Sequence, residues 1–207
     1  MKLRLKRILI PLIWAGIGIY FLLFLAAAFM FPGGSAFDAC QSGFSFFHNY
    51  WCDLMGSVCE IGVKNDARPL AVTGHLIMSG TMMIVFYVMP FLFEKQNRNA
   101  RLTRFFGFLA MAAMMFVFTD LHDRVIIFVA LSGTVALLPF FMELEKSNHL
   151  FLRRYAYFCF VCCVVIFTVY ETGFLIYWLP LLQKVVLLIC VGWILQMTRT
   201  VKPVLAI

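Results

Sequence analysis

The chain has 207 residues, of which 63% are hydrophobic and only 13% charged, and its mean hydropathy is +0.93. Soluble domains contain about 45–50% apolar residues, so a water-soluble fold is excluded because it would lack a polar shell. The net charge of +7 would suit nucleic-acid binding in a soluble protein. Here the basic residues stand in short clusters between apolar runs. We therefore expect an integral membrane protein whose partner is the lipid bilayer and not a nucleic acid.

Six apolar runs predict an all-α bundle of six transmembrane helices that forms one membrane domain over residues 1–207. A span needs roughly 20 apolar residues to cross about 30 Å of hydrocarbon. The first run exceeds the roughly 7–15 apolar residues of a signal peptide, and no convincing cleavage site follows, so we expect a retained anchor. The predicted spans are 8–31, 69–93, 102–119, 125–142, 155–179 and 185–197, with an outer loop over 32–68.

Lysine and arginine residues are divided unequally between the two sides of this predicted bundle. Cytoplasmic loops are enriched in these residues, so the basic side is cytoplasmic and both termini of a six-span chain lie there. The basic side holds Lys2, Arg4, Lys6, Arg7, Lys95, Arg98, Arg101, Arg104, Lys146, Arg153, Arg154, Arg199 and Lys202. The other side holds only Lys64, Arg68, Arg124 and Lys184. The host membrane stays open between a plasma or inner membrane and an endomembrane.

The predicted outer loop is long and contains an aromatic segment, residues 44–55. Loops of this length are usually functional or disordered, and this one is too aromatic to remain solvated. We expect it to lie at the membrane interface, where Trp and Tyr are favoured, or to fold into the mouth of the bundle. In an oxidising compartment two of Cys40, Cys52 and Cys59 could form a disulfide. The alternative is three free thiols.

Several ionisable residues fall in the outer half of the predicted bundle. Ionisable groups at membrane depth are costly and tend to mark function. His75 shares a helix face with Ser79, and Lys184 is the expected ion-pair partner of Glu171. The candidate ligand-binding cluster is Asp53, His75, Asp120, His122, Asp123, Glu171 and Lys184. Structural alternatives are a histidine bonded to a carbonyl group, a solvated turn at 120–124 and an ion pair that fixes helix packing.

Five short motifs extend over most of the chain. They are Asn49-Tyr50-Trp51-Cys52-Asp53-Leu54, the segment 65–69, Leu121-His122-Asp123, Tyr170-Glu171-Thr172 and Leu179-Pro180-Leu181-Leu182-Gln183-Lys184. Together they resemble a large family of six-span membrane proteins of unknown function, which is distantly similar to the DRAM-like (damage-regulated autophagy modulator) proteins. The resemblance implies a six-helix bundle whose polar motifs face outward. It implies no established reaction.

A weaker analogy connects the chain with the alkaline-ceramidase-like membrane hydrolases, which resemble seven-span bundles with a zinc ion held by three histidines. His48, His75 and His122 would supply that number of ligands here. A zinc-bound water has a pKa of about 7 and can attack an amide or an ester. The chain departs from the pattern because it has six predicted spans and because His48 lies in a loop.

Three functions follow from these observations. The first is an outward-facing polar site, capped by the aromatic loop, that binds a lipid head group or a small amphiphile. The second is a metal-dependent intramembrane hydrolase with zinc as cofactor. The third is a structural or regulatory membrane protein without catalysis. Small residues allow helices to approach closely, either within one bundle or between the protomers of a homo-oligomer; the candidates are Gly16, Gly18, Gly80 and Gly133.

Overall fold

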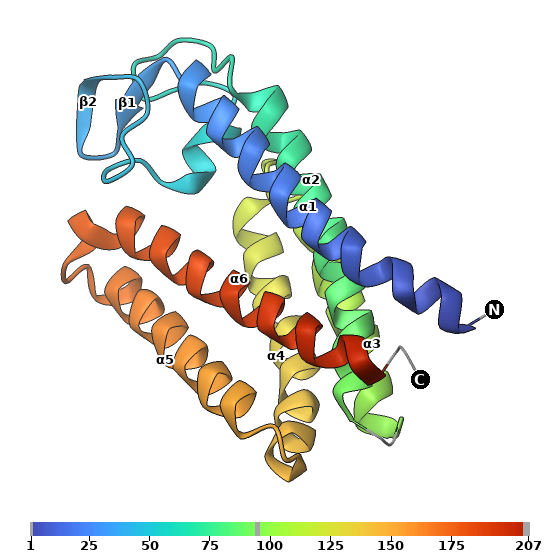
Figure 1. Ribbon diagram of the computed structural model, residues 1–207. Helices are drawn as coiled ribbons and strands as arrows, with labels where there is room; N and C mark the ends of the chain where they lie inside the picture. The colour runs from blue at the N-terminus through green and yellow to red at the C-terminus, as the bar shows by residue number, and fades with distance from the viewer. Residues whose placement is uncertain (1, 94–95, 205–207) are drawn as a thin grey trace.

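The computed structural model is predominantly helical and describes residues 2–93 and 96–204 (Figure 1). Lys95, one of the residues used for the orientation, lies outside these ranges. The helices are α1 (Lys2–Met30), α2 (Arg68–Val88), α3 (Arg98–Met114), α4 (His122–Lys146), α5 (Leu150–Thr172) and α6 (Leu179–Val204). The strands β1 (Gly33–Ser35) and β2 (Asp38–Ser42) pair antiparallel. Short 3-10 helices are η1 (Trp51–Met55), η2 (Met89–Leu92) and η3 (Ile176–Trp178).

Five stretches of the described chain are long and apolar enough to cross a membrane. They are Ile8–Met30, Arg68–Leu92, His122–Lys146, Leu150–Thr172 and Ile176–Val201. The chain is therefore a multi-pass integral membrane protein. Helix α3 is not among the five, because it has 17 residues and spans roughly 25 Å at about 1.5 Å per residue. Its three arginines, at positions 98, 101 and 104, lie in its first two turns.

Two helix ends differ from the sequence prediction. Helix α5 ends at Thr172 because Gly173 adopts a φ of 68°, a left-handed conformation that closes a helix and suits glycine. The predicted end of the fifth span at residue 179 is therefore wrong, and Glu171 lies in the last turn of α5. Helix α6 begins at Leu179 and includes Pro180, because proline fits a first helical turn. Residues 180–184 are thus helical and not the expected turn.

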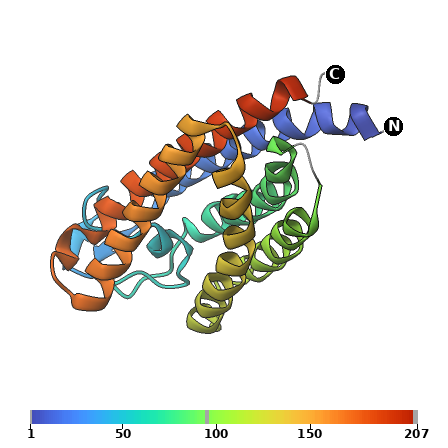
Figure 2. The same cartoon turned by 90° about the horizontal axis from the view of Figure 1, so that it is seen from below.

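The helices form antiparallel neighbours along the chain. Helix α1 packs on α2, α3 packs on α2 and α4, and α5 packs chiefly on α6. Figures 1 and 2 both show α5 and α6 side by side, and Figure 1 shows the hairpin β1–β2 close to the α5–α6 turn. The two chain ends lie away from that hairpin (Figure 1).

Buried side chains form two clusters, one toward each end of the bundle. The outer cluster joins Phe24 of α1 to Leu54 of the long loop and Ala71 of α2. The inner cluster includes Phe86 of α2 and Trp193 of α6. Lipid is as apolar as these side chains, so close packing between helices holds such clusters together in a membrane. Because Leu54 is fully buried, the long loop belongs to the packed core.

Candidate functional site

The long outer loop is organised by a fully buried asparagine, Asn49. Its Nδ2 donates to the carbonyl oxygen of Gly34 at 2.7 Å and to Oδ2 of Asp53 at 3.0 Å. Its Oδ1 accepts from Nε2 of Gln41 at 2.8 Å and from the backbone N–H of Ser45 at 2.9 Å. An amide side chain has two donor and two acceptor positions, and all four are used. Asn49 therefore ties the hairpin to η1.

A second buried asparagine, Asn65, holds the other end of η1. Its Nδ2 shares its protons among the carbonyl oxygens of Asp53, Leu54 and Gly56, at 2.9–3.1 Å. Its Oδ1 accepts from the backbone N–H of Ala67 at 3.0 Å. The contact fixes η1 against the start of α2, which begins at residue 68.

Asp53, predicted as a ligand-binding residue, is engaged within the loop. Its Oδ2 accepts hydrogen bonds from Asn49 and from the backbone N–H of Tyr50 at 2.8 Å, which closes the first turn of η1. Burial raises the pKa of the Asp53 carboxyl above its ordinary value, although both hydrogen bonds favour its charged form. Its role as a ligand-binding residue stays a prediction.

The aromatic segment of the loop folds onto the bundle. The indole N–H of Trp51 donates to the hydroxyl of Tyr20 on α1. The Trp51 ring stacks on Phe24, with centroids 5.1 Å apart and an interplanar angle of 17°, while Phe44 meets Trp51 edge-on at 6.1 Å. Of the two expected positions, the structure has the segment packed into the mouth of the bundle. Phe46 and Phe47 remain exposed.

Lys184 of α6 lies beneath this segment and is only 3% exposed. Its Nζ donates to the backbone carbonyl of Asn49 at 2.5 Å and to that of Pro180 at 3.0 Å. The ammonium also lies 5.5 Å from the ring centroid of Phe44, and Phe46 and Trp51 surround it as listed next.

The centroid of Phe46 is 5.2 Å from Nζ of Lys184, and that of Trp51 is 5.8 Å away; the distance for Phe44 is the 5.5 Å just given. Cations within about 6 Å of an aromatic face are attracted by its quadrupole. We call this arrangement, Lys184 with Phe44, Phe46 and Trp51, the lysine cage. It fastens the outer loop to α6 and thereby joins segments far apart in sequence.

The expected ion pair between Glu171 and Lys184 is not formed. Within residues 2–93 and 96–204 the ion pairs are His122–Asp123, Lys146–Glu143 and Arg153–Glu145. The backbone supplies the reason, because α6 begins at Leu179 and directs Lys184 to the loop. Glu171 is exposed at the end of α5.

The remaining predicted ligand residues lie apart from Lys184. His75 is buried, and its Nε2 donates to the carbonyl of Met114 at 2.8 Å, which joins α2 to the end of α3. Asp120, His122 and Asp123 are exposed at the α3–α4 junction, where Nδ1 of His122 is 3.1 Å from Oδ1 of Asp123. The structure therefore distributes the predicted outer cluster over separate places.

The three histidines predicted as metal ligands are also not brought together. His48 lies in the loop, where its Nδ1 is 3.3 Å from Oγ of Ser45 and its ring faces Tyr177 at 4.8 Å. In the described part of the chain, no group of three or more His, Cys, Asp or Glu side chains is arranged to hold a metal ion. The zinc-binding set His48, His75 and His122 is thus not assembled here.

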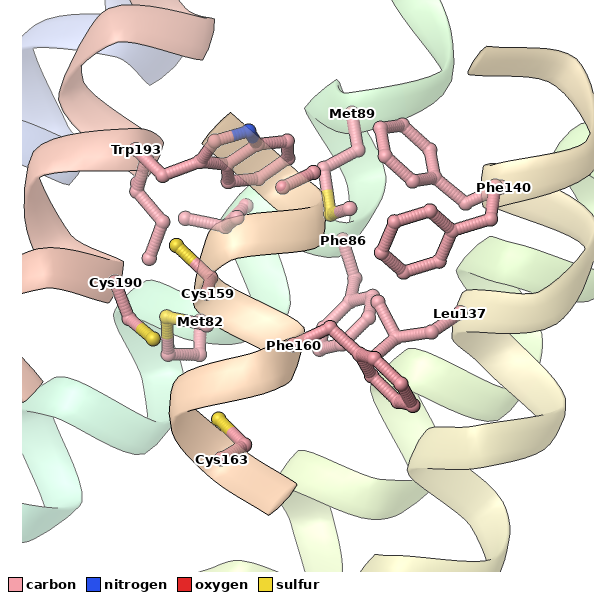
Figure 3. A pocket seen from close by; sticks show the side chains of 14 residues that line it. Met82, Phe86, Met89, Leu137, Phe140, Cys159, Phe160, Cys163, Cys190 and Trp193 are labelled. Atoms are coloured by element: carbon pink, nitrogen blue, oxygen red, sulfur yellow. The ribbon is translucent and has the colours of Figure 1, made fainter. Parts of the chain in front are cut away.

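A cavity of about 370 Å³ lies between α2, α4, α5 and α6 (Figure 3). Its wall is almost entirely apolar and includes Phe86, Phe140 and Trp193. Three thiols also face it, as described below. The lining residues come from 82–89, 137–141, 156–163 and 190–194, which places the cavity in the half of the bundle opposite the outer loop.

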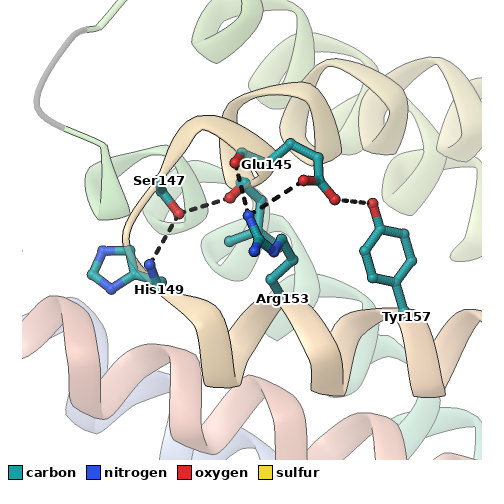
Figure 4. Close-up of polar contacts among 6 residues, drawn as sticks. Glu145, Ser147, His149, Arg153 and Tyr157 are labelled. Atoms are coloured by element: carbon teal, nitrogen blue, oxygen red, sulfur yellow. Dashed lines mark hydrogen bonds and ion pairs between the residues drawn. The ribbon is translucent and has the colours of Figure 1, made fainter.

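A polar network stands beside this cavity at the α4–α5 connection (Figure 4). The Tyr157 hydroxyl donates to the Glu145 carboxylate, and Nη1 of Arg153 donates to the Glu145 carbonyl at 2.8 Å. The ring of Tyr157 stacks on Phe141 with centroids 5.7 Å apart, and Phe141 itself lines the cavity. Polar groups are therefore continuous with the apolar wall.

Comparison of the chain with protein-family models, with curated proteins and with solved structures found no match. The resemblance to six-span membrane proteins therefore stays a prediction.

Sequence reasoning missed the residues that organise both regions. Asn49 and Asn65 stand in the quoted motifs, yet they are uncharged and gave no sign that their side chains are buried. The cavity has no sequence signal, because its wall is made of ordinary apolar residues from four helices. The seven cysteines are all free thiols in the structure, so neither Cys40, Cys52 nor Cys59 is paired.

Proposed function

We propose that the protein binds a lipid or another small amphiphile, with the apolar part of the ligand in the cavity between α2, α4, α5 and α6. The supporting observation is the cavity itself. Its volume of about 370 Å³ falls within the roughly 300–1,000 Å³ of ligand pockets, which are mostly lined by apolar and aromatic side chains. A bilayer offers such a wall a high concentration of acyl chains.

The proposal includes six crossing helices with both termini in the cytoplasm. Helix α3 packs along α4 in the opposite direction, so the two helices traverse the same slab. Its three arginines lie at the end where α2 finishes, and Arg104 donates to the carbonyl of Tyr87 there. Long basic side chains at a helix end reach the interface, so a 17-residue helix suffices.

The polar part of the ligand belongs at the α4–α5 connection rather than under the outer loop. The outer candidates are engaged or apart, whereas Arg153 and Tyr157 stand next to the cavity wall. The exposed Arg154 adds positive charge at this end, and basic residues at the cytoplasmic face attract anionic lipids. An amphiphile bound there has its head group at the interface and its tail in the cavity.

The test is native mass spectrometry of protein purified in mild detergent. Ala156 is 4% exposed and lines the cavity, so Ala156→Trp fills the space and Ala156→Leu fills part of it. Val161→Trp is the control, because Val161 is exposed on the same helix and does not line the cavity. We expect co-purified lipid on the wild type and on Val161→Trp, less on Ala156→Leu and none on Ala156→Trp.

Equal lipid on all four proteins would contradict the proposal. Helix content and thermal unfolding of each variant show whether a loss of lipid comes from misfolding. If Ala156→Trp does not fold, the graded loss between the wild type and Ala156→Leu decides.

A second candidate function is structural or regulatory, without catalysis. The observation that favours it is that Asp53, His75 and Lys184 each use their polar atoms within the chain. Buried polar groups that lock a fold need not have another role. This candidate gains if the purified wild-type protein contains no lipid.

A further inference from the structure

Three thiols gather on one wall of the cavity. Cys159 and Cys163 come from α5 and Cys190 from α6, and Figure 3 shows their sulfur atoms on the same side of the space. The thiols of Cys163 and Cys190 are hydrogen-bonded to each other. The Cys159 thiol lies 4.0 Å from the carbonyl oxygen of Ile189. The neighbouring Cys162 does not line the cavity.

These thiols lie deep in the membrane. Cys163 is roughly 20 Å from the start of α5, and Cys190 roughly 16 Å from the start of α6, at about 1.5 Å per residue. In a hydrocarbon core of about 30 Å, both positions are close to the middle. Reagents confined to water rarely reach that depth, whereas compounds dissolved in the lipid phase do.

Exposure separates the three thiols. Cys163 is exposed on the lipid-facing side of α5, while Cys159 and Cys190 are partly buried. Helix α5 buries only Leu152, Ala156 and Val169 among its described residues. A reagent arriving from lipid therefore meets Cys163 first, with Cys190 directly behind it.

We propose that Cys163 and Cys190 form an intramembrane dithiol that lipid-soluble organic hydroperoxides oxidise to a disulfide. The inference rests on the proposed function, because the hydroperoxide must enter the same cavity. Two thiols from adjacent helices, in contact and away from water, are the arrangement that such a reaction needs.

The chemistry has two steps. The sulfur of Cys163 attacks the terminal oxygen of the hydroperoxide, the O–O bond breaks, and an alcohol and a Cys163 sulfenic acid form. The sulfur of Cys190 then attacks the sulfenic sulfur, which forms the S–S bond and releases water. The two thiols lose two electrons and two protons, and the hydroperoxide gains them as alcohol plus water.

The test uses full-length protein in lipid nanodiscs, treated with cumene hydroperoxide or with hydrogen peroxide at equal concentration. Trypsin cleaves after Arg154, Lys184 and Arg199 and leaves peptides 155–184 and 185–199, which a disulfide would join. We expect a Cys163–Cys190 cross-link that forms at least about tenfold faster with cumene hydroperoxide, because apolar groups favour its transfer into hydrocarbon. Dithiothreitol should reverse the link.

Matched variants identify the reacting pair. Cys163→Ser and Cys190→Ser should abolish the cross-link, and Cys162→Ser should leave its rate unchanged. A link through Cys159 or Cys162, an unlinked sulfenic acid, no oxidation, or equal rates with both oxidants would overturn the proposal. Lipid bound to the reduced protein is measured in parallel: bound lipid without a cross-link refutes only the dithiol, whereas no bound lipid refutes the proposed function.

Discussion

Replacing Lys184 with methionine tests whether the lysine cage fastens the outer loop. Methionine has a similar length and removes the ammonium. The change eliminates the bonds to the carbonyls of Asn49 and Pro180 and the contacts with the rings of Phe44 and Trp51. If these contacts hold the loop, the loop should detach more often while the helices remain packed.

The size of the effect follows from opposing contributions. Hydrogen bonds from a charged donor are worth about 1.5–3 kcal/mol, and a desolvated cation–π contact about 2 kcal/mol. Dehydrating the ammonium costs several kcal/mol, however, and a buried charge replaced by an apolar group can be neutral. The cost that remains is the Asn49 carbonyl without its donor, about 1–3 kcal/mol. Loop opening should therefore become roughly 5- to 150-fold more frequent.

Hydrogen exchange of the amides in segment 44–55, with the protein in nanodiscs, measures this opening. Protection should fall in Lys184→Met within that segment and stay unchanged in α2 and α4. The control is Lys64→Met, because Lys64 is exposed in the same loop. Unchanged protection in Lys184→Met, or an equal loss in Lys64→Met, would refute the role of the cage.

Two further predictions concern the loop and the α1–α2 contact. Because burial raises the pKa of Asp53 above its ordinary 3.8, the folded loop binds this proton more tightly than the unfolded loop; the resulting stability is complete below pH 3.8 and is lost as pH rises through the folded pKa. Exchange corrected for intrinsic rates should show this loss, and Asp53→Asn should remove it. A Cβ on Gly16 would overlap Oγ1 of Thr81, whereas one on Gly18 meets nothing; Gly16→Ala should lower unfolding stability by about 1–3 kcal/mol and Gly18→Ala should not.

The sequence predicted the helices where composition alone decides them. The first and fourth predicted spans, 8–31 and 125–142, fall largely within α1 and α4. Errors came at boundaries set by single residues. Pro180 fits both a turn and a first helical turn, and only the structure distinguishes them. The apolar run 102–119 continued past the end of α3 because residues 115–119, although apolar, turn without forming a helix.

The candidate site was harder to predict, because its contacts join distant segments. Lys184 was chosen for its charge beside apolar residues, yet its partners are a backbone carbonyl and rings more than 130 residues earlier in the chain. Charge suggested Glu171 instead. Likewise Gly16 and Gly18 look alike in sequence, and only the position of Thr81 makes one of them a close contact.

The two ends of the bundle differ in how completely their groups are satisfied, and this difference indicates where a ligand enters. At the outer end Asn49, Asn65 and Lys184 use their polar atoms to hold the loop shut. At the other end α5 packs chiefly on α6 and leaves most of its surface to lipid. Local opening needs the least free energy where few contacts must break. A ligand should therefore enter sideways from the bilayer past α5, so variants that release the outer loop should leave lipid binding unchanged.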